Sequence, residues 1–288
     1  RYFRIHTREE IKKRKSFYHL TPFLLEKLAY SKRFEPLHLS HYVNRISSAW
    51  EMQISALVLS VDEWAYVAYR GTDDTLIGWK EDFNFSYRSE TSGQSQAVRY
   101  LNQVGKDMDK PLYVGGHSKG GNFAMYASCF CDESVKERII KVYNNDGPGF
   151  RDEIINTDEY KKALPKICSI VPQTSIIGQL LSNEAKQIVI KSNATGIFQH
   201  DAMTWEVEKD KFVDSELDDF SKFVNSALGT WLEELDDETR ESVVSTVFTM
   251  IEDTGAETFK ELGASLFKNA ELIIKGLVNL PKEKRDEL

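Results

Sequence analysis

The pattern of apolar and polar positions predicts alternating strands and helices over the first 205 residues. Residues 52–60 and 64–70 are rich in β-forming side chains and predict a hairpin or two adjacent strands. Residues 94–107 carry apolar side chains at helical spacing, directly before a short buried strand at 112–115. This alternation favours an α/β fold with a mostly parallel sheet covered on both faces. The remaining predicted elements are helices over 21–33 and 122–130 and strands over 139–144, 167–171 and 187–190.

The pattern changes after Trp205. Residues 215–235, 238–252 and 256–280 have the apolar spacing of amphipathic helices. We therefore divide the chain into a core with an N-terminal helical segment, residues 1–205, and a helical extension, residues 206–288. The extension is either an appendage packed on the core or a lid or docking surface over an active site.

One segment between a predicted strand and a predicted helix has the form of a nucleophile elbow. Gly116-His117-Ser118-Lys119-Gly120 places a serine between small residues two positions away on either side. The turn is strained and the helix packs close to the strand, so a β-carbon at Gly116 or Gly120 would clash. Ser118 is thus the candidate nucleophile of an α/β-hydrolase fold.

A serine nucleophile needs a base, and the order of residues along the chain selects one. In α/β-hydrolases the order is nucleophile, acid, histidine. Among the six histidines, only His200 follows Ser118. It lies after the last predicted strand of the core, so we expect it to be the base. The other histidines precede Ser118 or lie within the elbow: His6, His19, His38, His41 and His117.

The acid that orients the base has several candidates. Asp146 follows an apolar run and precedes Gly147-Pro148-Gly149, which places it at the carboxyl end of a strand. Open α/β sheets bind ligands at that edge, so we expect Asp146 to be the acid. The alternative is a carboxylate that caps the Gly-Pro turn. The other carboxylates considered are Asp132, Asp152, Asp158 and Glu184.

Acyl transfer also needs hydrogen-bond donors for the oxyanion. The backbone N–H of Lys119, at the start of the elbow helix, is one expected donor. The second is expected from Thr72, which offers a backbone N–H and a hydroxyl, with Gly71 allowing close approach. The alternative is an ordinary turn at the end of a strand.

These motifs together resemble a known family. Tyr69-Arg70-Gly71-Thr72, Trp79-Lys80-Glu81-Asp82 and the Gly-His-Ser-x-Gly elbow resemble the class 3 lipases. With the segments 145–150 and 198–205 added, the set is similar to the Mbeg-like bacterial α/β-hydrolases over about residues 20–205. The resemblance implies Ser118 as nucleophile, His200 as base and Thr72 as an oxyanion residue.

The sequence departs from the class 3 lipases at the acid. Those enzymes usually carry an Asp-Pro-Val stretch after the next strand, whereas Val171-Pro172-Gln173-Thr174-Ser175 has no carboxylate. Either Asp146 takes the role one strand earlier, or the triad is incomplete.

Composition and motifs limit the partners, cofactors and compartment that we expect. A net charge of −8 argues against nucleic acid as the main partner, and no apolar run reaches the length of a membrane span. No metal-binding or nucleotide-binding motif is present, so we expect no cofactor and no metal. The three cysteines form no paired framework, which favours a reducing, cytoplasmic compartment.

The sequence therefore predicts a lipase-like serine esterase that cleaves a small-molecule carboxylic ester, lipid esters included, through an acyl-enzyme. One alternative is a non-catalytic binding or scaffold protein with a lipase fold. Another is an acyltransferase or thioesterase with the same triad.

Overall fold

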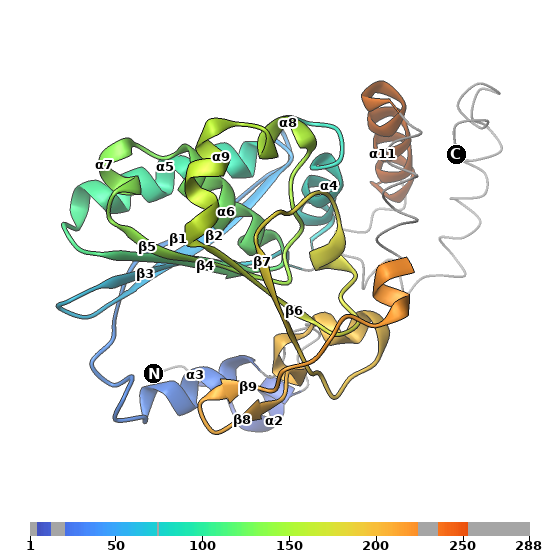
Figure 1. Ribbon diagram of the computed structural model, residues 1–288. Helices are drawn as coiled ribbons and strands as arrows, with labels where there is room; N and C mark the ends of the chain where they lie inside the picture. Colours follow the sequence, from blue (N-terminus) through green and yellow to red (C-terminus); the bar gives the residue numbers. More distant parts are fainter. Residues whose placement is uncertain (1–4, 13–20, 74, 224–235, 253–288) are drawn as a thin grey trace.

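A single seven-stranded sheet organises the protein. The computed structural model describes residues 5–12, 21–73, 75–223 and 236–252. The strands lie side by side in chain order, antiparallel from β1 to β3 and parallel from β3 to β7 (Figure 1). This confirms the mostly parallel sheet of an α/β-hydrolase fold. The strands span His38–Ser47 (β1), Met52–Ser60 (β2), Ala65–Tyr69 (β3), Leu112–His117 (β4), Ile139–Asn145 (β5), Ile167–Pro172 (β6) and Lys186–Ile190 (β7).

The helices that connect the parallel strands lie on one face of the sheet (Figure 1). Each parallel strand adds on the same side of its predecessor, so right-handed crossovers bring every connection to the same face. Accordingly, alternate β3 residues Ala65, Val67 and Tyr69 are buried, whereas Tyr66 and Ala68 are only partly buried. The short helices α2 (Arg8–Lys12) and α3 (Thr21–Ala29) lie on the other side of the sheet (Figure 1). The helices are α4 (Leu76–Asn84), α5 (Ser92–Asp107), α6 (Lys119–Phe130), α7 (Glu133–Lys136), α8 (Asp152–Ile155) and α9 (Asp158–Ala163).

Helix α6 forms the centre of the core. It contacts β4 and β5 of the sheet and packs beside α5 and α9. Its residues Phe123, Ala124, Met125 and Ala127 have no exposed surface. A fully buried side chain of the size of phenylalanine or methionine contributes about 1.5–3 kcal/mol. Ser118, the residue that precedes α6, therefore stands at the start of a deeply buried helix.

Several boundaries differ from the sequence prediction. Strand β1 was not predicted, because this edge strand exposes apolar side chains such as Leu39 and Tyr42 and is interrupted by a bulge. The first predicted helix ends early, as α3 (Thr21–Ala29), and the elbow helix starts earlier than predicted, at Lys119. The shorter elements are α2 (Arg8–Lys12), β8 (Val207–Glu208), β9 (Lys211–Phe212) and the 3-10 helices η1 (Leu164–Lys166), η2 (Ile177–Gln179), η3 (Gly196–His200) and η4 (Ala202–Thr204).

The chain beyond Trp205 returns to the sheet before it becomes helical. Lys191 and Ser215 donate backbone hydrogen bonds that tie this segment to the end of β7, at 2.8 Å and 2.9 Å. Residues 215–218, predicted to be helical, are therefore extended beside the sheet, and helix begins only at 219. The predicted helix at 238–252 is confirmed as α11 (Asp237–Glu252). Residues 224–235 and the helix predicted over 256–280 lie outside the described residues.

Helix α11 packs on α4. Val244 and Phe248 of α11 form a buried apolar cluster with Tyr87, and Trp79 of α4 packs against it. Among the described residues, no helix is long and apolar enough to cross a bilayer.

Candidate active site

Ser118 sits in a strained backbone conformation at the tip of β4. Its φ of 58° and ψ of −132° lie in a region that side chains rarely adopt. A β-carbon at Gly116 would lie 2.3 Å from the backbone of Gly120, and one at Gly120 would lie 2.2 Å from the Tyr69 carbonyl oxygen. Glycine is thus required at both positions for the strand, the turn and α6 to pack. The Ser118 N–H donates to the Asn145 carbonyl at 3.0 Å, which ties the turn to the end of β5.

Asp146 and His200 are hydrogen-bonded to each other. Asp146 follows β5 directly, and its Oδ2 lies 2.7 Å from Nδ1 of His200. Its Oδ1 accepts from the Ser175 hydroxyl at 2.5 Å and from the Gly178 N–H at 3.2 Å. Only 1% of the Asp146 surface is exposed. The carboxylate is therefore fixed by the loop after β6 and presents its free edge to the imidazole of His200.

The support for Asp146 comes from an unexpected segment. Ser175 lies in the stretch after β6 that lacks the carboxylate of the class 3 lipases, and it supplies a hydroxyl to Asp146 instead. The other acid candidates do not join this arrangement. Asp132 accepts from Asn102, Asp152 accepts from Ser182, and Asp158 starts α9. Glu184 lies in the loop before β7, where its N–H donates to the Tyr160 hydroxyl.

His200 is held against the elbow by His117. The two rings lie 4.5 Å apart between centroids, and His117 Nε2 donates to the His200 carbonyl oxygen at 2.7 Å. Burial, together with the neighbouring His200, lowers the pKa of His117 to about 4, so its imidazole is neutral near pH 7. The sequence alone carries no signal for this contact of His117. Its contact places the His200 ring beside the residue that precedes Ser118.

The loop after β3 lies against the elbow on the other side. A β-carbon at Gly71 would lie 2.7 Å from the His117 carbonyl oxygen and 3.1 Å from Ser118 Cβ, so only glycine permits this approach. Within the part of the chain that the structure describes, neither Thr72 nor Lys119 donates its backbone N–H to a protein acceptor. Two N–H groups close to Ser118 are therefore available to a ligand.

The Thr72 hydroxyl, by contrast, is already engaged. It donates to Oδ2 of Asp82, on α4. The sequence suggests this hydroxyl as a second oxyanion donor. When Asp82 is ionised, however, the hydroxyl proton of Thr72 points to the carboxylate. The residue at 72 therefore offers its backbone N–H.

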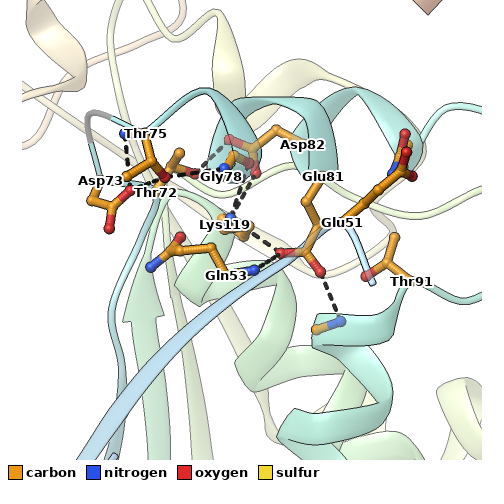
Figure 2. Close-up of polar contacts among 12 residues, drawn as sticks. Glu51, Gln53, Thr72, Asp73, Thr75, Gly78, Glu81, Asp82, Thr91 and Lys119 are labelled. Carbon is orange, nitrogen blue, oxygen red and sulfur yellow. Dashed lines mark hydrogen bonds and ion pairs between the residues drawn. The ribbon is translucent and has the colours of Figure 1, made fainter. Parts of the chain in front are cut away.

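Behind the elbow, Lys119 forms a buried charge cluster with Glu81 and Asp82 (Figure 2). Its Nζ lies 3.3 Å from Oε2 of Glu81 and 3.7 Å from Oδ1 of Asp82. Burial raises the pKa of Asp82 to about 6; Glu81 adds to this shift, while Lys119, the Thr72 hydroxyl and His200 oppose it. The α4 motif that contains both carboxylates is visible in the sequence, but their contact with Lys119 is not.

No site for a metal ion was found in the described ranges: they contain no group of three or more His, Cys, Asp and Glu side chains placed to hold one. The residues around Ser118 instead bring together a serine, an imidazole, a carboxylate and unpaired N–H groups. This set of groups is suited to acyl transfer.

Several solved structures are similar to parts of this chain. Solved structures with a similar fold include a fungal lipase–inhibitor complex, with 15% identity and a TM-score of 0.45 over 64% of this chain and 77% of that chain. Lipase II from Rhizopus niveus is 16% identical, with a TM-score of 0.41 over 56% of this chain and 68% of that one. A Rhizomucor miehei lipase–propeptide complex is 18% identical, with a TM-score of 0.41 over 55% of this chain and 57% of that one.

No curated protein matches the chain by sequence. One family model does match, over residues 28–249, and it covers the whole sheet and every candidate site residue. That span is well over half of the 288 residues. The chain belongs to the Mbeg1-like family.

Proposed function

We propose that the protein is a serine hydrolase of the lipase and esterase type, with Ser118, His200 and Asp146 as its catalytic triad. The observation that carries the proposal is the 2.7 Å hydrogen bond between Asp146 and His200, beside a serine in a strained elbow. A carboxylate bound to Nδ1 leaves Nε2 of the imidazole without its proton, which is the tautomer that a general base requires.

The first half-reaction forms an acyl-enzyme. The Ser118 hydroxyl attacks the carbonyl carbon of the ester while Nε2 of His200 takes its proton. The negative charge that develops on the carbonyl oxygen is stabilised by the backbone N–H groups of Thr72 and Lys119. His200 then donates its proton to the leaving alcohol, and Asp146 stabilises the imidazolium in between.

Water completes the reaction. His200 removes a proton from a water molecule, which attacks the acyl-enzyme through a second tetrahedral intermediate. The Ser118 oxygen leaves with the proton from His200, and the carboxylic acid is released.

The surroundings of His200 favour an apolar acyl group. Ile197, Phe198 and Met203 flank the histidine in sequence, and all three are exposed, with 71% of Phe198 accessible. These three side chains lie within three positions of His200 in the sequence, and exposed apolar side chains at a reactive site are typical of sites that bind apolar ligands. The proposed substrate is thus a carboxylic ester with an aliphatic acyl chain, such as a lipid ester.

Hydrolysis of a chain-length series tests the proposal. We expect p-nitrophenyl esters to be cleaved by the protein and not by Ser118→Ala, with kcat/KM rising from acetate to butyrate or longer chains. Equal rates for the two proteins would contradict the assignment of Ser118. An inactive protein that nevertheless folds would favour the binding or scaffold alternative.

A further inference from the structure

One ammonium group behind the elbow contacts three oxygen atoms of a single helix. Lys119 Nζ donates to the Gly78 carbonyl at 3.0 Å and lies within ion-pair distance of Glu81 and Asp82 (Figure 2). The side chains of Lys119 and Glu81 have no exposed surface. The residue after the candidate nucleophile is therefore bound to α4, the helix that follows the loop of Thr72.

The two carboxylates of the buried charge cluster have different surroundings. Glu81 accepts backbone N–H groups from Gln53 at 2.9 Å and from Gly93 at 2.7 Å, so it ties α4 to β2 and α5. Asp82 accepts the Thr72 hydroxyl on Oδ2, while its buried Oδ1 has no hydrogen-bond donor among the described residues. The cation that compensates Oδ1 is Lys119, at 3.7 Å.

Stability alone does not explain a lysine at this position. A buried ion pair stabilises a fold little, because desolvation of the charges offsets their attraction, and an apolar residue of similar volume often does as well or better. Lys119 Nζ also lies 5.9 Å from the centre of the Phe123 ring. The ammonium group therefore calls for a role beyond packing, and one of its three oxygen partners, Asp82, accepts the Thr72 hydroxyl.

We propose that Lys119 is a positioning residue for the oxyanion hole: its ammonium group holds Asp82, and Asp82 in turn holds Thr72. The inference rests on the proposed function. Lys119 would then connect both donors: its own N–H is the first, and its ammonium group fixes the loop that carries the second. The charged and polar groups that face Asp82 come from three other places: Lys119 on α6, Thr72 in the loop after β3, and His200 after β7.

Loss of the ammonium group has a defined consequence. Asp82 would remain buried beside Glu81 without its cation, so it would take up a proton at a higher pH. The Thr72 hydroxyl would lose its fixed acceptor. The backbone N–H of Thr72, the second oxyanion donor, would then lose its position. Because the oxyanion exists only in the transition state and the intermediates, kcat falls while KM changes little.

A double-mutant cycle with Lys119→Met, Asp82→Asn and the combined variant tests this. With p-nitrophenyl butyrate at pH 8, we expect Lys119→Met to lower kcat about 10- to 100-fold, with KM within about threefold. In the Asp82→Asn background the same change should lower kcat by less than about twofold, because the lysine acts through the aspartate. The acidic limb of the rate profile should move up by about one pH unit in Lys119→Met.

Two further variants control the experiment. Lys119→Gln keeps a donor for the Gly78 carbonyl and serves where Lys119→Met does not fold. Lys80→Met removes another cation of α4, one that pairs with Glu51 at 2.9 Å, and is expected to keep the parent kcat.

Three results would overturn the inference. The first is a folded Lys119 variant with the parent kcat and pH profile. The second is an equal loss of kcat on Lys119→Met in the parent and in Asp82→Asn. The third is failure of both Lys119→Met and Lys119→Gln to fold, which would assign the lysine to stability. A fluorophosphonate probe separates this failure from failure of the proposed function. A parent protein labelled at Ser118, with the same labelling rate in Lys119→Met, contradicts the positioning role alone, whereas a parent that is neither labelled nor active contradicts both.

Discussion

Asp146 is a buried carboxylate and Asp82 a partly buried one; they come from either side of the elbow strand and are held in opposite ways. Asp146, after β5, receives hydrogen bonds from Ser175, Gly178 and His200. Asp82, on α4, receives one from Thr72, and its other oxygen faces only the more distant Lys119 ammonium. Hydrogen bonds on both oxygens fix Asp146, whereas one oxygen of Asp82 is compensated by charge alone. Because burial raises the pKa of Asp82 to about 6, the hydrogen bond between Asp82 and Thr72 is expected to change as the pH falls through 6.

The largest effect should follow from Asp146→Asn. The asparagine Oδ1 can keep the bonds from Ser175 and Gly178, but its amide would face Nδ1 of His200 and force the proton onto Nε2. That tautomer cannot accept the serine proton, so we expect kcat for p-nitrophenyl butyrate to fall about 10⁴-fold. Asp152→Asn changes an exposed carboxylate of α8; it is the matched control and should leave kcat unchanged. A loss of less than tenfold in Asp146→Asn would mean that another group orients His200.

A smaller and pH-dependent effect is expected for Asp82→Asn. At pH 8 the parent carboxylate is ionised and accepts the Thr72 hydroxyl, so the variant should show a kcat about 10- to 100-fold lower. Because the pKa of Asp82 is about 6, the parent loses this advantage as the pH falls through 6. The ratio of the two kcat values should therefore approach about one below pH 5. A ratio that stays constant from pH 5 to 8 would contradict the dependence on charge.

The same substitution should alter stability in the opposite sense. The folded-state pKa of about 6 lies above the usual value of 3.8, so the folded protein binds this proton more tightly than the unfolded chain does. The contribution of Asp82 to stability is thus complete below about pH 4 and is lost as the pH rises through 6. Asp82→Asn should flatten this part of the profile of melting temperature against pH. A melting temperature at pH 8 well below that of the parent would contradict the account.

The smallest effect is expected for Ser175→Ala. It removes one of two protein donors to Oδ1 of Asp146 and leaves the Gly178 N–H in place. We expect kcat to fall about three- to tenfold, since a hydrogen bond to a charged group contributes about 1.5–3 kcal/mol and relaxation recovers part of it. Ser221→Ala is the matched control, because its buried hydroxyl bonds to the Ser175 carbonyl and not to the carboxylate. Equal kcat values for the two variants would assign Ser175 to packing alone.

Most of the candidate site residues could be predicted from the sequence, but Ser175 could not. The elbow was visible because glycine spacing is a local signal, and His200 stood out because one histidine follows the serine. Asp146 was visible as a carboxylate at the end of a strand. Ser175 could not be identified, since its contact with Asp146 joins residues 29 positions apart and a lone serine has no pattern of its own.

Lys119 and β1 show two other limits. A lysine in a turn motif is normally expected at the surface, and only the arrangement of α4 against α6 buries it with Glu81. Strand β1 exposes residues that a buried strand would cover, so period-two alternation is weak there. The placement of the connecting helices on one face of the sheet depends on strand order, which local periodicity does not encode.

Labelling of the protein by a fluorophosphonate, with the modified residue mapped by mass spectrometry, tests the central claim most directly. The probe forms a covalent bond with a serine only where a base activates it and an oxyanion hole stabilises the adduct. We predict one adduct per chain, on Ser118, that is absent from Ser118→Ala and forms at least 100-fold more slowly in Asp146→Asn. No adduct on the folded protein, or equal labelling of Ser118→Ala, would contradict a serine hydrolase centred on Ser118.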